Sequence, residues 1–335
     1  MSFTKYSFAT VVPSICLFLL SCNGNKQNEA NNNLPQDTTS RSQVNVPSFN
    51  DDTAYAYVSR QVAFGPRIPG SEAQRKCADW MESVLKTVCD TVYKQDVHVT
   101  AGDGKSLPCI NLVGVINPNA AKRILLLTHW DSRPWADNDT KDKDKPILAA
   151  DDGGSGVGVL LELARAIKAN KLPKNIGIDI LFTDVEDYGR TEWGENSYCL
   201  GTQYWATHPH VKGYKADFGI LLDMVGAHNA RFPMEGFSAQ YAGDVQQTVW
   251  QEASRAGYAS YFRYLEGADI TDDHVSVNKI TGIKTIDIIN LNSEGPFAPH
   301  WHTHQDNMSI IDRNTLKAVG QTLLQVIYET AQQPG

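Results

Sequence analysis

Apolar residues recur along most of the chain with the spacing of alternating strands and helices. Short apolar or alternating runs predict strands over 90–100, 109–116, 123–129, 176–184, 216–224 and 283–290. Helical spacing predicts helices over 51–64, 71–88, 157–169, 198–208, 244–256 and 313–331. Elements that alternate in this way favour a single α/β domain, an α/β/α sandwich around a mostly parallel, doubly wound mixed sheet.

The first residues have a different pattern. An apolar run from Val11 to Leu20 follows Lys5, and it is too short to span a bilayer, as is typical of a signal-peptide core. It ends in Leu19-Leu20-Ser21-Cys22, which resembles the cleavage site of bacterial lipoproteins. We therefore expect a lipoprotein-type signal peptide over 1–22 with Cys22 as the lipidated residue; ordinary signal cleavage is the alternative.

The next segment, 23–46, is rich in Asn, Gln, Ser and Thr and predicts a disordered tether. We expect residues 47–335 to form the folded domain. The protein is then exported, as a periplasmic or outer-membrane-associated lipoprotein, with Cys22 as its only membrane contact.

Charge and cysteine content narrow the choice of partners. The 335-residue chain has a net charge of -8 and no run rich in Lys and Arg, which argues against nucleic acid. It has no glycine motif of the phosphate-binding type. Four cysteines follow Cys16 and Cys22 without forming a CxxC pair, and we expect them to be buried thiols: Cys77, Cys89, Cys109 and Cys199.

Five clusters of acidic residues and histidines stand out, several of them directly after predicted strands. They are His-Trp-Asp at 129–131, Asp-Asp-Gly-Gly-Ser-Gly at 151–156, Asp-Val-Glu-Asp at 184–187, Leu-Asp-Met at 222–224 and Trp-His-Thr-His at 301–304. Because the carboxyl ends of parallel strands line the crevice where such sheets bind ligands, these side chains should converge. Carboxylates that lie so close together repel one another, and a bound cation relieves the repulsion. The sequence therefore predicts a metalloenzyme.

Each cluster also has a simpler explanation. The aspartates at 151–152 could cap the following helix, Glu186 and Asp187 could form a solvated loop, and the segment 272–274 could be an exposed acidic turn. His302 alone would be an exposed loop histidine. A catalytic zinc, however, takes three His or carboxylate ligands, and Asp152, His302 and one of Glu186 or Asp187 would supply such a set. The other of that pair would then face the substrate, where a general base is needed.

In this order, six motifs resemble the zinc aminopeptidase superfamily and, within it, the type II glutaminyl cyclases. They are His-Trp-Asp-Ser-Arg-Pro at 129–134, Ala-Ala-Asp-Asp-Gly-Gly-Ser-Gly at 149–156, Phe-Thr-Asp-Val-Glu-Asp at 182–187, Leu-Leu-Asp-Met-Val-Gly-Ala at 221–227, Asp-Asp-His at 272–274 and Trp-His-Thr at 301–303. The resemblance runs from about Val58 to the carboxyl terminus.

This resemblance implies one zinc ion on Asp152, Asp187 and His302, with Glu186 as the proton shuttle. It places two further aspartates in an acidic network beside Glu186 and three aromatic residues on the substrate pocket wall: Asp223 and Asp272, and Trp193, Phe297 and Trp301. Animal cyclases carry Glu where this chain has Asp187.

The implied reaction converts the amino-terminal glutamine of peptides and proteins to pyroglutamate and releases ammonia. The alternative is a zinc aminopeptidase with one or two metals. In the two-metal form His129 and Asp223 would hold the second ion; otherwise His129 and Asp131 would lie behind the ligands and support them. Trp301 before the metal-binding histidine favours the cyclase, because aminopeptidases commonly have Tyr there. A binding module that retained the fold is a third, non-enzymatic alternative.

Overall fold

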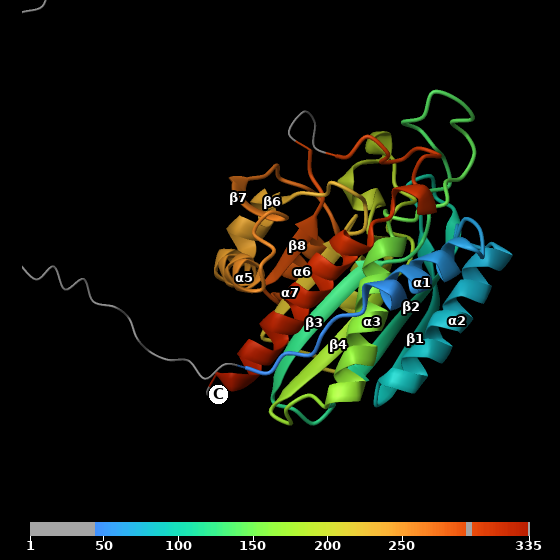
Figure 1. The fold of residues 1–335 in the computed structure, drawn as a ribbon. Coiled ribbons are helices and arrows are strands. Elements are labelled where there is room, and N and C mark those ends of the chain that lie inside the picture. The colour runs from blue at the N-terminus through green and yellow to red at the C-terminus, as the bar shows by residue number, and fades with distance from the viewer. Residues whose placement is uncertain (1–43, 293–296, 334–335) are drawn as a thin grey trace, which may run out of the picture. The chain divides into compact units, whose positions relative to one another are not determined.

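A six-stranded mixed sheet forms the centre of the domain (Figure 1). The computed structural model describes residues 44–292 and 297–333. In the strand order β1-β2-β4-β3-β5-β8, the last four strands are parallel; β2 pairs antiparallel with β4, and β1 pairs antiparallel with β2. The strands are β1 Thr91–Thr100, β2 Ser106–Ile116, β3 Lys122–His129, β4 Ile176–Thr183, β5 Phe218–Asp223 and β8 Thr285–Ile289. The predicted mostly parallel sheet is confirmed.

Helices cover both faces of this sheet. Successive residues of a strand point to opposite faces, and apolar side chains on both faces need to be buried. Ile124 and Leu126 belong to the larger core, whereas Leu125 and Leu127 belong to a separate core on the other face. The first face carries α1 Asp51–Val62, α2 Glu72–Val88, α3 Gly154–Asn170, α5 Gly236–Arg255 and α7 Arg313–Gln332. The second carries α4 Leu200–Thr207 and α6 Asp273–Thr281. The doubly wound α/β architecture is therefore as predicted.

Three features were not predicted. A small parallel sheet pairs β6 Phe232–Met234 with β7 Phe262–Glu266, and four of the five residues of β7 are exposed, so it has no alternating apolar pattern. Helix α5 begins at Gly236, before its strong apolar periodicity, because the Glu235 carboxylate accepts hydrogen bonds from two of its first amides. The segment 272–274 begins α6 and is buried, which excludes the exposed acidic turn.

The chain order brings the functional motifs to one edge of the sheet. Strand β3 lies between β4 and β5; α3 connects β3 to β4 on one face of the sheet, and α4 connects β4 to β5 on the other face. Such a switch in direction leaves a crevice beyond the carboxyl ends of the strands. His129 ends β3, Asp223 ends β5, and Glu186 and Asp187 follow β4 by three and four residues. The fold alone therefore gathers these four side chains.

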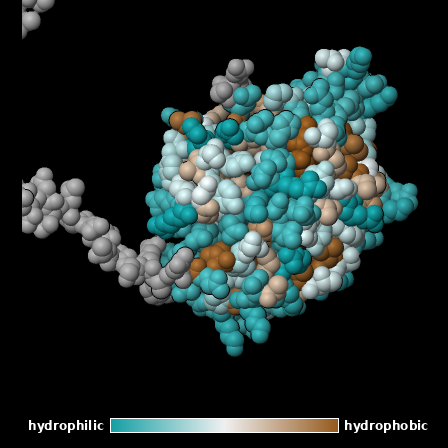
Figure 2. Space-filling model, in the orientation of Figure 1, coloured by the Kyte–Doolittle hydropathy of each residue, from teal (hydrophilic) through white to brown (hydrophobic). Residues whose placement is uncertain are grey.

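The amino-terminal predictions lie almost wholly outside the described residues, which begin at Val44. Val44 and Val46 already pack against the larger core. Within 44–292 and 297–333, no helix combines the length and the apolar character needed to cross a membrane. The face of the domain shown in Figure 2 is mostly hydrophilic, with apolar residues scattered over it. The four cysteines at 77, 89, 109 and 199 are free and buried, as predicted.

Candidate metal centre and active site

Asp152, Asp187 and His302 bring one ligand atom each to a common point, all within 4.8 Å of one another. His302 Nε2 lies 3.3 Å from Asp187 Oδ1 and 3.6 Å from Asp152 Oδ2. Asp152 Oδ2 and Asp187 Oδ2 are buried and accept no hydrogen bond within the described part of the chain. Buried carboxylate oxygens need a partner, so this donor set fits a divalent cation such as zinc.

The charge of this cluster also favours a cation. Burial opposes protonation of His302, but Asp187 and the hydrogen bond to Asp137 raise the pKa of its imidazole to about 9. A positive charge is therefore stabilised where the two carboxylates meet His302. A metal ion bound there would take the place of that proton.

A second layer of residues holds Asp187 and His302 in place. Arg133 Nη1 donates to Asp187 Oδ1 at 2.8 Å and to its carbonyl oxygen at 3.0 Å, while Nη2 donates to Asp137 Oδ2 at 2.6 Å. Asp137 Oδ1 lies 3.4 Å from His302 Nδ1, which leaves Nε2 of that ring for a metal. Such second-layer carboxylates fix the ring orientation and tautomer of a ligating histidine.

Asp306 holds Asp152 through the backbone. Its two carboxylate oxygens accept the amide hydrogens of Asp151 at 2.7 Å and Asp152 at 3.1 Å. Burial and the adjacent carboxylates of Asp151 and Asp152 raise the pKa of Asp306 to about 8. Asp151 itself is engaged elsewhere, because it accepts from the Gly226 amide at 2.7 Å and lies 2.9 Å from His300 Nε2. Only Asp152 of this pair faces the metal position.

The helix-cap explanation for 151–152 does not hold. The N-cap of α3 is Gly153, and no side chain caps this end of the helix. Gly153 has φ +97°, and a Cβ there would lie 2.7 Å from the Asp131 carbonyl oxygen and 2.9 Å from His129 Cε1. The glycine is required because the turn presses directly against the end of β3.

His129 belongs to a second donor group that shares Asp152 with the first. Its Nε2 atom lies 3.1 Å from Asp152 Oδ1 and 3.3 Å from Asp223 Oδ1, and its Nδ1 atom lies 3.3 Å from Asp131 Oδ1. Burial opposes charge on this ring, but the hydrogen bonds that it donates to the three aspartates raise the pKa of His129 well above its usual value. Burial and the proximity of Asp152 raise the pKa of Asp223 to about 6, although the hydrogen bond from His129 opposes the shift.

Asp131 also orients the loop that follows β4. Its carboxylate accepts the amide hydrogens of Glu186 at 3.1 Å and Asp187 at 3.2 Å. Val185 just before them has φ +54°, a left-handed conformation that is a genuine outlier for a β-branched residue. Strain of this kind is held at functional sites by the surrounding contacts. Here it turns Glu186 and Asp187 in different directions.

Glu186 faces the pocket beside the metal position. Cys199 Sγ donates to Glu186 Oε1 at 3.4 Å, and atoms of Glu186, Cys199 and Asp272 lie within 4.8 Å of one another. Burial, together with the carboxylates of Asp187 and Asp272, raises the pKa of Glu186 well above its usual value, against the effect of His129. Burial and Asp223 do the same for Asp272. A carboxyl with a raised pKa can both accept and return a proton.

A pocket of about 270 Å³ opens over these groups. Phe297 and Trp301 line it and stack on each other with ring centroids 4.1 Å apart, and Trp301 stacks on His302 at 3.7 Å. The other lining residues are Asp152, Glu186, Asp187, Thr191, Glu195, Tyr198, Asp223, Ile270, Thr271, Asp272, Ile289 and His302. The pocket thus holds an acidic floor and an aromatic wall.

Trp193 lies apart from this wall. It packs in an aromatic group with Trp135 and Tyr188, at centroid distances of 6.3 Å and 6.4 Å, and it is not among the described residues that line the pocket. Tyr198, which no sequence pattern singles out, lines the pocket instead.

The structure brings most of the other predicted site residues together. It also shows several supporting residues that the sequence analysis did not predict. Asp152, Asp187, His302, Glu186, Asp223 and Asp272 line one pocket, with His129 and Asp131 directly behind it. Sequence reasoning missed the supporting residues Arg133, Asp137, Cys199, His300 and Asp306. Only Arg133 had a sequence signal, because it belongs to the His-Trp-Asp-Ser-Arg-Pro motif. The others act through contacts between distant segments.

Comparisons with known proteins agree with this geometry. The model of peptidase family M28 matches residues 111–327. The glutaminyl cyclase of Bacteroides thetaiotaomicron, solved with N-acetylhistamine, is 48% identical with a TM-score of 0.83, covering 85% of this chain and 99% of that one. A Zn-dependent exopeptidase from Parabacteroides distasonis is 50% identical, with a TM-score of 0.82 and the same coverage. The glutaminyl-peptide cyclotransferase of Bos taurus is 25% identical over 291 residues, which is 79% of this chain and 77% of its own. The chain belongs to peptidase family M28.

Proposed function

We propose that this protein is a zinc-dependent glutaminyl-peptide cyclotransferase. It converts the amino-terminal glutamine of peptides to pyroglutamate and releases ammonia. The observation that carries the proposal is the pocket of about 270 Å³, in which Glu186 and Asp272 face the three-ligand group under an aromatic wall. The similarity to the glutaminyl cyclases supports it.

The ligand group and Glu186 would divide the chemistry. Zinc held by Asp152, Asp187 and His302 would supply Lewis-acid polarisation of the γ-carboxamide oxygen. The Glu186 carboxylate accepts a proton from the substrate's α-ammonium group. The freed amine forms a bond to the γ-carbon and gives up a second proton. The bond from that carbon to the amide nitrogen then breaks, and the leaving nitrogen takes up both protons, the first of them from Glu186, and departs as protonated ammonia. Asp272 lies close to Glu186 and accepts a hydrogen bond from the leaving amide.

Positioning accounts for much of the acceleration, since the nucleophile and the carbonyl belong to one residue. Holding a glutamine side chain bent toward its own amine makes the attack effectively unimolecular. Phe297 and Trp301 would press the side chain into this shape and keep water from competing as the nucleophile. The small pocket volume suits a single side chain.

A two-metal aminopeptidase is the second candidate. The second donor group of His129, Asp152 and Asp223 favours it, because two groups that share a carboxylate could hold a pair of ions. The cyclase is favoured because the curated relatives are cyclotransferases.

The product of a glutamine-initiated peptide separates the two. Mass spectrometry after incubation with residues 43–335 and zinc should show loss of one ammonia from an otherwise intact peptide. Release of free glutamine and a shortened peptide would instead identify an aminopeptidase. Glu186→Gln should lose turnover by at least about a hundredfold while keeping its zinc, and a fully active variant would show that another group moves the proton.

We also propose that the protein is exported and lipid-anchored through Cys22. The support is the sequence of the signal segment and its cleavage site. Labelling cells with a radioactive fatty acid should mark the wild-type protein and not Cys22→Ser. If both proteins were labelled, the lipid would be attached at another residue. If neither were labelled, the signal peptide would be removed by ordinary cleavage without lipidation.

A further inference from the structure

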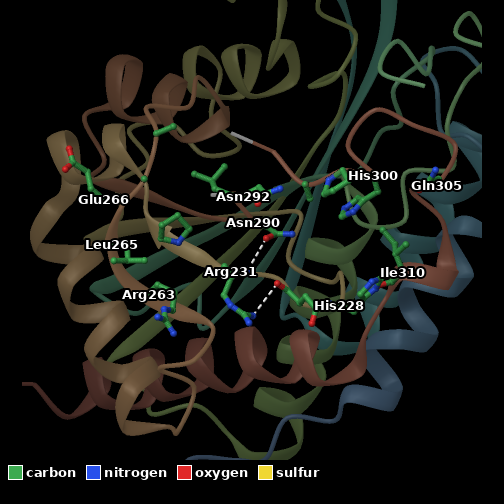
Figure 3. Close-up of a pocket in the computed structure, with 17 residues that line it drawn as sticks. His228, Arg231, Arg263, Leu265, Glu266, Asn290, Asn292, His300, Gln305 and Ile310 are labelled. Atoms are coloured by element: carbon green, nitrogen blue, oxygen red, sulfur yellow. Dashed lines mark hydrogen bonds between the residues drawn. The ribbon is translucent and has the colours of Figure 1, made fainter. Parts of the chain in front are cut away.

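A second, larger hollow lies behind the aromatic wall of the catalytic pocket. This groove has a volume of about 950 Å³ and is formed by β6, β7, the chain after β8 and the loop that carries His300 (Figure 3). Its size is that of an ordinary ligand site. No step of the cyclisation described above uses it.

The groove is cationic in a protein whose net charge is -8. Arg231 and Arg263 line it, and neither forms an ion pair with a carboxylate of the residues that the structure describes. Among the described residues, Arg231 Nη1 donates to two carbonyl oxygens, at 2.8 Å to Ala230 and 3.3 Å to Asn229. Glu266 is the acidic residue of the lining, and in Figure 3 its carboxylate is turned away from Arg231. An anionic ligand would complement the two guanidinium groups.

Arg231 is exposed near the centre of this groove (Figure 3), and a hydrogen bond holds its backbone. Its amide donates to Asn290 Oδ1 at 3.0 Å, and Asn290 is buried at the end of β8. Leu265 on β7 is 59% exposed at the groove and offers apolar contact beside the charges. Guanidinium groups next to an apolar side chain suit a peptide that carries carboxylates.

The two hollows share their walls. Phe297 and Trp301 face the catalytic pocket, while the residues between them, 298–300, line the groove. Likewise Ile289 lines the pocket and the next residue, Asn290, lines the groove. An extended peptide advances about 3.3 Å per residue, so a chain whose first residue fills the pocket crosses this rim within a few residues.

We propose that the groove binds acidic side chains of the substrate, at about its fourth and fifth residues, and so makes the enzyme selective for glutamine-initiated peptides that are acidic after the amino terminus. This inference rests on the proposed cyclase function. Arg231 and Arg263 are the specificity-determining residues, and they act on binding of the peptide rather than on the chemical step.

Competition between two peptides of equal length and opposite charge, with a short peptide as reference, tests the proposal. The substrates are Gln-Ala-Ala-Glu-Glu-Ala-Ala, the same peptide with Lys in place of Glu, and the short Gln-Ala-Ala. We expect the wild-type enzyme to favour the acidic peptide about three- to tenfold in kcat/KM over the basic one, with less preference at high salt. Arg231→Gln/Arg263→Gln should remove that preference, mainly through KM, and cyclise Gln-Ala-Ala at the wild-type rate.

A matched control removes two charges elsewhere. Arg75 and Lys76 lie exposed on α2, so Arg75→Gln/Lys76→Gln changes the net charge equally and should keep the preference. If the wild-type enzyme cyclises Gln-Ala-Ala but does not prefer the acidic peptide, the groove does not bind substrate. The same conclusion follows if both double variants lose the preference equally. If no peptide is cyclised, the cyclase function itself fails.

Discussion

Cys199 illustrates how a single side chain can position the reacting group. Its thiol gives the carboxylate of Glu186 a hydrogen bond at 3.4 Å, and the residue has φ +56° at the start of α4. Burial, then the charges of Asp273 and Glu186, raise the pKa of Cys199 well above its ordinary value. The thiol therefore stays protonated and orients Glu186 Oε1, which leaves Oε2 for the substrate.

Cys199→Ala should accordingly lower kcat about three- to tenfold, because Glu186 loses its donor. We expect KM, zinc content and the unfolding midpoint to stay close to the wild-type values. Cys199→Ser restores a donor of similar size and should recover most of kcat. Equal losses in the Ala and Ser variants would show that packing of the thiol matters rather than its hydrogen bond.

The buried carboxylate of Glu235 makes the stability of the fold depend on pH in the acid range. Burial opposes its charge, but hydrogen bonds from His274 and Ser238 and from the Ile270 amide lower the pKa of Glu235 to about 2. A carboxyl whose pKa is lower in the folded state stabilises the fold above its unfolded pKa of about 4.3. That stability is lost as the pH falls from about 4.3 through about 2.

Denaturant unfolding of metal-free wild-type protein and Glu235→Gln at several pH values measures this contribution. At pH 7 the variant should be less stable by on the order of 2 kcal/mol. The difference should shrink as the pH falls toward 3, because the Glu235 carboxyl takes up a proton in the unfolded chain below about pH 4.3, whereas in the folded protein, with a pKa of about 2, it stays ionised. A difference that does not change with pH would contradict the lowered pKa.

At the scale of elements, the parallel strands were predictable because both faces are buried and their apolar runs are continuous. The positions of His129 and Asp223 at strand ends follow from those runs. Strands β6 and β7 have too little buried surface to leave a pattern, and β7 is exposed over four of its residues. Helix α6 has only nine residues, and its first turn is made of the polar segment 272–274.

Sequence patterns could not predict the side-chain contacts between elements that are distant in the chain. Asp306 holds the amides at 151–152 across about 155 positions of the chain, and Arg133 reaches Asp187 across 54. No periodicity records such a pairing. For the same reason the sequence could not place Trp193 beside Trp135 and Tyr188 instead of on the pocket wall. The motifs predicted which residues take part, and the fold decides which of them touch.

For the whole molecule, the sheet supplies one acidic crevice with two overlapping donor groups. Asp152 belongs to both, and the remaining donors divide into Asp187 and His302 on one side and His129 and Asp223 on the other. Asp131 also contacts His129. A single-zinc cyclase uses the first group as ligands and keeps the second as a network that holds Asp152 in place. A peptidase with two ions would use both.

Zinc titration of metal-free enzyme, with activity followed on a glutamine-initiated peptide, tests this directly. The account predicts that pyroglutamyl peptide formation rises linearly and reaches its plateau at one equivalent of zinc. It also predicts that His129→Ala still binds one equivalent and keeps measurable cyclisation. A plateau only at two equivalents, with free glutamine as the product and no activity in His129→Ala, would contradict the single-zinc cyclase.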